Sequence, residues 1–260
     1  MSYRQSEFNK KFIRSKNILI KYYTSPLLDN YEIPHAYFTK TESEVDLSLL
    51  KSNFCSDNLN YHIKQIHSNY IVFASTLYMK NITEADGIIS DKSNQNLWIY
   101  TGDCMPVFFA DITSKRVAAI HCGRKGLEKK ILNKLIQTFK NLGCKSKELL
   151  VSIGPSISKV HYKLDKKTTI NFYENLYLTD NFADKSSYQI SIPFQELEDD
   201  KIFKVDLKKH AYFQLINQNI PSSNIDISNK CTFISKNEFH SYRRSKTSLR
   251  QWNFISTFNN

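Results

Sequence analysis

Apolar residues fall in short runs along most of this chain, and polar or turn-forming residues bound each run. Runs of this length, rich in β-branched and aromatic residues, predict strands. The segments 97–111 and 115–121 are the most apolar and predict central strands buried on both faces. Further strands are expected at 17–23, 35–39, 148–153, 225–227, 232–234 and 251–256.

Two neighbouring segments, 61–66 and 70–74, have the pattern of a β-hairpin with His67 at its turn. The stretch that follows, 80–86, is polar and predicts a loop.

One helix is predicted clearly, from Lys125 to the glycine at 143, because apolar residues recur there at three- and four-residue steps and form one buried stripe. Gly143 is expected to end it. The segments 168–177 and 205–219 have weaker helical patterns. Between these two, 179–201 is polar and acidic, and we expect a mobile excursion there.

The composition bounds the overall organisation. A chain of 260 residues that is 41% hydrophobic can bury one sizeable core, so we expect a single domain over 1–260 with a frayed end at 1–15. The five cysteines are odd in number and scattered, and no secretory leader precedes them, which predicts a reducing cytoplasm. No segment approaches the roughly 18 apolar residues of a membrane span.

The chain is basic, with a formal net charge of +11. Its lysines are spread evenly and form no arginine-rich stripe, so we expect no nucleic-acid partner. A basic field of this kind favours small anionic substrates such as phosphate.

Three residues suggest a metal site: His67, Cys104 and His121. Each lies at the edge of a predicted strand, and side chains at the ends of neighbouring strands converge. Three protein ligands leave a fourth position open, which is typical of a catalytic zinc site. Asp103 adds a carboxylate beside the cysteine, as an acid or base or as support for a metal-bound histidine.

The residues alone leave a plainer interpretation open. Cys104 would then be a small buried hydrophobe, His67 a surface histidine and His121 a core histidine bonded to a carbonyl. Cys122 follows His121 directly and points to the opposite face of an extended segment, so we interpret it as a core residue.

Several motifs together resemble one known family. They occur in the family's order and span residues from about 60 to 250: Gln65-Ile66-His67, Glu84-Ala85-Asp86-Gly87, Thr101 to Val107, His121 to Gly126, Gly154-Pro155-Ser156-Ile157 and Ser241-Tyr242-Arg243-Arg244. The chain resembles the YfiH or laccase-domain family of bacterial proteins, which are described both as multicopper polyphenol oxidases and as purine nucleoside phosphorylases.

The resemblance implies an α+β fold of mixed β-sheets in a layered sandwich with flanking helices. It also implies zinc held by His67, Cys104 and His121. The implied activity is phosphorolysis of purine nucleosides, namely adenosine, inosine, guanosine or methylthioadenosine, with adenosine deamination as a side activity. Copper ranks lower, because one cysteine and two histidines cannot build the several centres of a multicopper oxidase.

In this interpretation Cys104 and Asp103 are the catalytic residues. Arginine supplies forked donors for phosphate, so Arg243, Arg244 and Arg124, with Tyr242, are the expected substrate-binding residues. Lys40 and Lys125 are further anion-binding candidates. His161 is not expected to be a fourth ligand, because it would close the open position.

The chain departs from the family pattern at several places. Arg124 stands where members usually have tryptophan, and Lys163 stands where they have glutamate. Two alternatives therefore stay open: a metal-free hydrolase or amidase using Cys104 and a histidine, and a degenerate non-catalytic binding protein. We expect a monomer.

Overall fold

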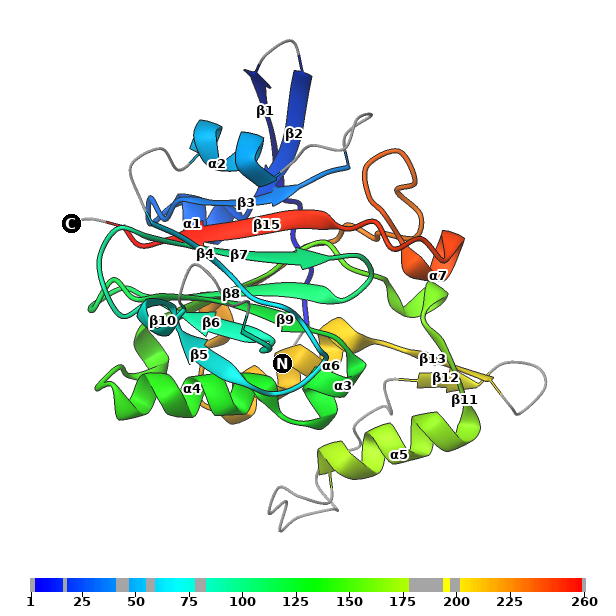
Figure 1. Ribbon diagram of the computed structural model, residues 1–260. Helices are drawn as coiled ribbons and strands as arrows, with labels where there is room; N and C mark the ends of the chain where they lie inside the picture. The colour runs from blue at the N-terminus through cyan, green and yellow to red at the C-terminus, as the bar shows by residue number, and fades with distance from the viewer. Residues whose placement is uncertain are drawn as a thin grey trace.

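The computed structural model describes residues 3–15, 18–40, 47–54, 59–77, 83–177, 194–196 and 202–258. Two six-stranded sheets lie face to face, with helices outside them (Figure 1). The first sheet has the order β1-β2-β3-β15-β7-β4. Its strands are Asn9–Ser15, Ile18–Thr24, His35–Phe38, Gln251–Ser256, Gln95–Thr101 and Leu59–His62.

The second sheet has the order β14-β10-β8-β9-β6-β5. Its strands are Ile225–Ile227, Leu149–Ile153, Met105–Asp111, Val117–Cys122, Gly87–Ile89 and Ile71–Phe73. A small third sheet, β11-β13-β12, consists of Lys163–Asp165, Ile202–Val205 and Phe194–Glu196. Parallel and antiparallel pairs occur in both large sheets, so the predicted mixed α+β class is confirmed.

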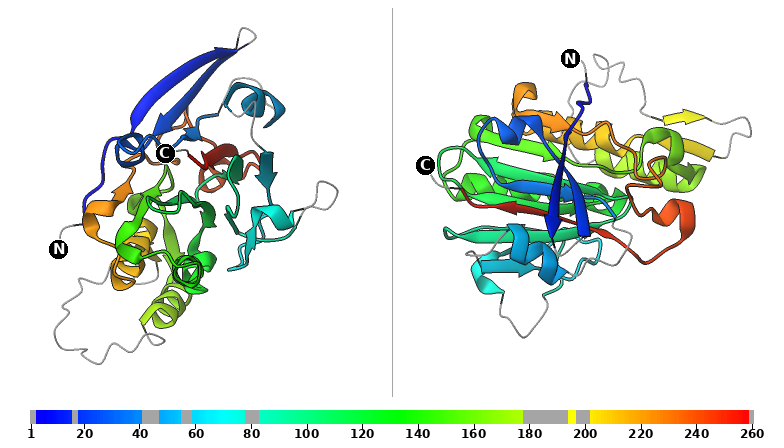
Figure 2. Two further views of the ribbon diagram at one scale, coloured as in Figure 1. Left: turned by 90° about the vertical axis from the view of Figure 1, so that its left-hand side faces the viewer. Right: turned by 90° about the horizontal axis from the view of Figure 1, so that it is seen from above.

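The helices cover both outer faces of this pair of sheets. Helices α3, α4 and α6 lie against the second sheet, and α2 lies against the first (Figures 1 and 2). The α-helices are α1 Pro26–Asp29, α2 Leu47–Phe54, α3 Arg124–Glu128, α4 Ile131–Asn141, α5 Lys166–Tyr177, α6 Leu207–Asn217 and α7 Tyr242–Ser245. Short 3-10 turns are η1 Ala74–Thr76, η2 Ser146–Glu148, η3 Lys159–His161 and η4 Ser222–Asn224.

Strand β8 shows why the central strands are so apolar. Val107 and Phe109 face the helices, whereas Phe108 and Ala110 face the other sheet. Successive side chains of a strand point to opposite faces, and here both faces are buried. The continuous apolar run therefore follows from the position of β8 in the middle of the layers.

Gly102 and Asp103 belong to a bend that divides the predicted segment 97–111 into β7 and β8. β7 pairs with β15 in the first sheet, whereas β8 pairs with β9 and β10 in the second. The bend therefore carries the chain from one sheet to the other, and Cys104 lies in it.

The predicted hairpin of 61–66 and 70–74 is wrong. β4 pairs in parallel with β7 in the first sheet, and β5 pairs in parallel with β6 in the second. The connection through His67 crosses between the sheets. Local alternation predicted the two strands correctly, but strand partners are set by long-range packing.

The N-terminal expectation is also wrong in part. Residues 9–15 form β1, which pairs antiparallel with β2 over its whole length, and the two strands project from the body (Figures 1 and 2). A polar, basic sequence is compatible with a strand at a sheet edge, because its side chains stay in solvent there.

The single helix predicted from Lys125 is two helices, α3 and α4. Lys130 lies between them in the left-handed region at φ 55° and interrupts the helix. The apolar stripe continues across the break, which is why the periodicity gave no sign of it. Gly143 ends α4 at φ 86°, as predicted.

Near the C-terminus, 225–227 and 251–256 form the predicted strands, but 232–234 is a turn with a single bridge at Cys231. The mobile excursion predicted at 179–201 falls outside the described residues except for β12. The loop predicted at 80–86 is described only from Thr83 onward. None of the described helices is long and apolar enough to span a membrane.

Candidate metal centre

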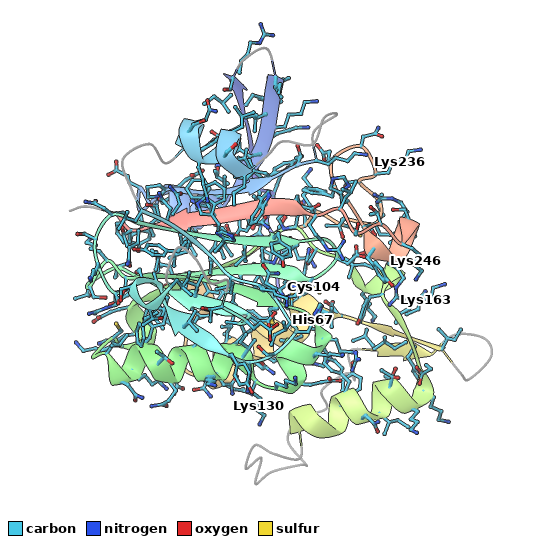
Figure 3. All side chains as sticks on the ribbon, in the orientation of Figure 1. His67, Cys104, Lys130, Lys163, Lys236 and Lys246 are labelled. Carbon is cyan, nitrogen blue, oxygen red and sulfur yellow. The ribbon has the colours of Figure 1, made fainter. Side chains whose placement is uncertain are left out.

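The structure brings together the three predicted metal ligands at one end of the sheets. Cys104 comes from the bend between β7 and β8, His121 from β9, and His67 from the crossing between β4 and β5. Their ligand atoms lie within 4.8 Å of one another, and Cys104 Sγ is 3.9 Å from His67 Nε2. Figure 3 shows Cys104 and His67 close together above α3.

The donor set fits zinc. Zinc binds thiolate sulfur at about 2.3 Å and imidazole nitrogen at about 2.0–2.1 Å, so tetrahedral neighbours lie roughly 3.5 Å apart. The 3.9 Å between Cys104 Sγ and His67 Nε2 is only slightly longer. His121 is buried, Cys104 is half-buried and His67 is exposed, so the cluster opens toward solvent on one side.

Asp86 fixes the orientation of His121. The carboxylate Oδ1 of Asp86 lies 2.7 Å from His121 Nδ1, and the aspartate is fully buried. A histidine that donates Nδ1–H to a carboxylate presents Nε2 as its electron-pair donor. His121 is thereby held with a ring nitrogen toward Cys104, as a candidate metal ligand.

The same aspartate also fixes the His67 loop. Its carboxylate accepts backbone N–H bonds from Ile66, His67 and Ser68, and a further bond from the Ser68 hydroxyl. His67 itself has φ 58°, an uncommon value for a residue with a side chain, which these bonds stabilise. One buried carboxylate therefore positions two of the three candidate ligands.

Because Gly123 has no side chain, its backbone can pack closely against the Cys104 thiol. A Cβ built on Gly123 would lie 2.6 Å from Cys104 Sγ and 3.7 Å from His67 Cδ2. A side chain at this position would displace the sulfur from the cluster. This is the physical reason for a glycine directly after Cys122.

The electrostatics of the cluster favour a thiolate. Burial opposes ionisation of Cys104, but the charge and hydrogen bonds of His121, with those of His67, hold its pKa below the usual range. Burial likewise opposes a charged His121, yet the neighbouring Cys104 and Asp86 raise its pKa. For Asp86, burial raises the pKa, but bonds from His121 and Ser68 outweigh it and lower the pKa to about 2. A thiolate is the form of cysteine that binds metals or attacks substrates.

Asp103 contacts a different part of the site. Its Oδ1 accepts from the Thr232 hydroxyl at 2.8 Å, and its Oδ2 accepts from the Arg243 backbone N–H at 2.7 Å. Its own carbonyl accepts from Ile157 N–H at 3.0 Å. Asp103 therefore ties together three loops around the cluster, and both carboxylate oxygens serve as acceptors.

The two arginines of α7 differ in their contacts. Arg244 donates to the backbone carbonyls of Thr232, Phe233 and Phe239, so its guanidinium holds a loop. Arg243 lies across the Tyr162 ring, with Cζ 4.9 Å from the ring centroid. Only Arg243 of this pair is thus placed beside the site.

The remaining predicted residues lie outside the group of His67, Cys104 and His121. Arg124, in the first turn of α3, pairs with Glu128, and Tyr242 is exposed beside Lys246 and Arg250. Lys163 and Lys246 lie at the same end of the molecule as Cys104 (Figure 3). His161 stacks on Phe233 outside the cluster, and Cys122 is buried in the core, as expected.

Sequence reasoning missed two residues. Asp86 belongs to the motif Glu84-Ala85-Asp86-Gly87 that carried the family resemblance, yet its contacts with His121 and the His67 loop depend on β6 and β9 being paired. Tyr162 follows η3 and keeps the tyrosine of the family run that begins at Gly154-Pro155, yet it was not among the site residues expected from the sequence.

Comparison with known proteins gives a family and a set of relatives. Residues 45–257 match the family model described as multi-copper polyphenol oxidoreductase laccase. A purine nucleoside phosphorylase of Synechocystis is 28% identical over 86% of this chain and 90% of its own length. A purine nucleoside phosphorylase of Clostridium acetobutylicum is 30% identical over 82% of this chain and 83% of its own length.

Solved structures of the same fold exist. YlmD from Geobacillus stearothermophilus superposes with a TM-score of 0.76 at 19% identity, covering 96% of this chain and 100% of that chain. The YfiH protein of Bacillus licheniformis gives a TM-score of 0.73 at 18% identity, covering 95% of this chain and 99% of that chain. At these identities the likeness shows the fold.

Proposed function

This chain belongs to the multi-copper polyphenol oxidoreductase laccase family, and on that premise we propose that it is a zinc-dependent purine nucleoside phosphorylase. The observation that carries the proposal is the convergence of His67, Cys104 and His121, with their ligand atoms within 4.8 Å. Relatives named purine nucleoside phosphorylase over most of their length support the substrate class.

We assign His67, Cys104 and His121 as the residues that hold zinc. Thiolate and imidazole ligands suit zinc better than magnesium or calcium. Zinc held by these residues would supply a Lewis acid. A multicopper oxidase needs several centres, and the described part of the chain contains this one cluster of histidine and cysteine ligands, so copper chemistry is not proposed.

In phosphorolysis a phosphate oxygen forms a bond to the anomeric carbon of the ribose while the bond to the purine nitrogen breaks. The electron pair of the broken bond leaves with the purine. The charge of the phosphate requires fixed donors, and we assign Arg243 to this role. Asp103 holds the Arg243 backbone, and since both its oxygens accept hydrogen bonds we assign it to positioning and not to proton transfer.

The direct test is product analysis with protein purified without added metal. Inosine, adenosine, guanosine and methylthioadenosine are each incubated with and without phosphate. We expect about one zinc per chain, and free base with ribose 1-phosphate only when phosphate is present. Conversion of adenosine to inosine would reveal deaminase activity. Failure of every nucleoside to release base with phosphate would contradict the proposal.

Cys104→Ala tests the cluster, with Cys122→Ala as the matched control. Removing the softest ligand should abolish zinc binding and activity, whereas the surrounding strands should still pack. Cys122 is buried but faces the core, so its variant should keep both zinc and activity. Both are measured by metal analysis and initial rates. Stoichiometric zinc in Cys104→Ala would remove Cys104 from the ligand set.

A second candidate is a metal-free hydrolase or amidase, favoured by the 3.9 Å between the Cys104 thiol and His67 Nε2. Cys104 would then be the nucleophile and His67 its base. Metal-free protein that hydrolyses amides and loses this activity on thiol alkylation would favour this alternative. Zinc and nucleoside binding without any turnover would instead indicate a non-catalytic binding protein.

A further inference from the structure

Tyr162 is held rigidly beside the metal centre. Its backbone N–H donates to the carbonyls of Ser158 and Lys159, and its carbonyl accepts from Val205 N–H at 2.9 Å in β13. Its partly buried ring packs against the core cluster between the second sheet and the helices. Both the backbone and the ring of Tyr162 are therefore fixed before any ligand binds.

The face of this ring supports Arg243. The guanidinium Cζ lies 4.9 Å from the ring centroid, within the range of a cation–π contact. Arg243 Nη1 donates to the Lys163 carbonyl at 2.7 Å, and its backbone is held by Asp103. A guanidinium has five N–H donors, so donors beyond the one given to Lys163 can meet a ligand.

The hydroxyl of Tyr162 meets a second arginine from a distant part of the sequence. Burial raises the pKa of this hydroxyl and Arg124 acts in the opposite direction, so the two groups lie near each other; Arg124 also pairs with Glu128 one turn further along α3. Arg124 directly follows Gly123, the residue packed against Cys104 Sγ. Tyr162 is close enough to Cys104 to respond to its charge.

Two cations from separate elements thus share one tyrosine at the edge of the cluster. Like charges repel, and Glu128 balances only one of them. An arrangement that holds two guanidinium groups around a fixed ring is suited to an oxyanion with several acceptor oxygens.

We propose that Tyr162 is a positioning residue that sets Arg124 and Arg243 as a pair to bind one inorganic phosphate beside His67, Cys104 and His121. The proposal rests on the phosphorolysis proposed above, because phosphate is then a substrate. It adds a residue that was not among the site residues expected from the sequence. It also excludes Arg244, whose guanidinium is committed to three backbone carbonyls.

The test compares Tyr162→Phe with Tyr162→Leu. The phenylalanine variant keeps the ring under Arg243 and removes the hydroxyl near Arg124, whereas leucine removes both the ring and the hydroxyl. We expect KM for phosphate to rise about threefold to tenfold in Tyr162→Phe. A further rise of roughly threefold to tenfold is expected in Tyr162→Leu. Three other quantities should stay close to wild type: KM for inosine, kcat at saturating phosphate, and zinc content. A general structural defect would change these quantities as well.

Tyr23→Phe is the matched control. Tyr23 is buried, donates to Glu238 at 2.7 Å and has Lys10 and Lys230 over its ring, but it lies in the first sheet away from the cluster. Its loss should reduce stability and leave phosphate KM unchanged.

Calorimetric titration with inorganic phosphate separates this proposal from the proposed function. Wild-type binding that weakens in both Tyr162 variants supports the arginine pair, even if no nucleoside is cleaved and the proposed function fails. Phosphorolysis with unchanged phosphate KM and affinity in both variants overturns the role of Tyr162 and leaves the proposed function standing. Wild-type protein that binds no phosphate at millimolar concentration also overturns it.

Discussion

At the scale of single residues, the neighbouring arginines of α7 should respond differently to removal. Arg243→Ala removes a charged donor to phosphate, worth roughly 1.5–3 kcal/mol, and should raise phosphate KM by about one to two orders of magnitude. Arg244→Ala should lower the free energy of unfolding because three carbonyls lose their donor, and should leave phosphate KM unchanged. Initial rates and urea unfolding measure the two effects. Equal phosphate KM in Arg243→Ala and wild type would remove Arg243 from the anion site.

His35 predicts a pH dependence of stability. Its buried ring lies with Nδ1 2.7 Å from the Ile33 carbonyl, while Nε2 accepts from Ser25 N–H at 2.7 Å, so the folded protein holds it neutral. Burial lowers its pKa to about 4, although the Ile33 carbonyl and nearby Asp29 and Asp226 act in the opposite direction. The unfolded chain binds the proton near pH 6.5, so stability is full above that pH and falls between about 6.5 and 4.

The loss at His35 is on the order of 3 kcal/mol at its full extent. His35→Gln, which cannot titrate, should show a shallower fall in urea-unfolding free energy over this window. Burial also lowers the pKa of His210, to about 3, so this histidine contributes in the same direction. It is present in both proteins. An identical slope in wild type and His35→Gln would show that His35 is not the group responsible.

At the scale of elements, the end of α4 is set by backbone geometry. Gly143 N–H donates to the Lys140 carbonyl and Cys144 N–H to the Phe139 carbonyl, which is the Schellman pattern. Gly143 has φ 86°, and nothing lies within 4 Å of a Cβ built on it, so the cost of a side chain is conformational alone.

Gly143→Ala should therefore reduce the free energy of unfolding by about 1–2 kcal/mol. Gly143→Asn should cost less, because asparagine tolerates the left-handed region. Thermal or urea unfolding of both variants measures the difference. If alanine and asparagine cost the same, backbone conformation is not the reason for glycine at this position.

At the scale of the whole molecule, Tyr37 of β3 in the first sheet contacts the end of β10 in the second sheet, and this contact joins the two large sheets. The Tyr37 ring stacks on Phe108 with centroids 4.7 Å apart, and its hydroxyl donates to Ser152 Oγ at 2.8 Å. A Cβ on Gly154 would lie 2.3 Å from Tyr37 Cε1.

Gly154→Ala should therefore destabilise the protein by about 1–3 kcal/mol, since the ring cannot move without losing both contacts. Replacing Tyr37 by leucine in the same chain should make the Gly154→Ala cost smaller, because the clashing ring is gone. A double-mutant cycle in urea measures this coupling. If the destabilisation by the two substitutions is strictly additive, contact with Tyr37 is not the source of the strain in Gly154→Ala.

The sequence by itself determined most elements and the identity of the candidate ligands. Apolar runs located the central strands because both of their faces are buried, and the apolar stripe after His121 located the helical segment. Residue type and nearness to strand ends are local properties and suggested His67, Cys104 and His121, and the family resemblance implied the same three residues.

Only the tertiary structure decided how these parts meet. The strands on either side of His67 belong to different sheets, and Asp86 orients His121 because β6 pairs with β9. Arg243 faces Tyr162, although Arg244 follows it directly in the chain. Strand partners and side-chain contacts depend on packing between segments far apart in the sequence, and a local pattern carries no information about that packing.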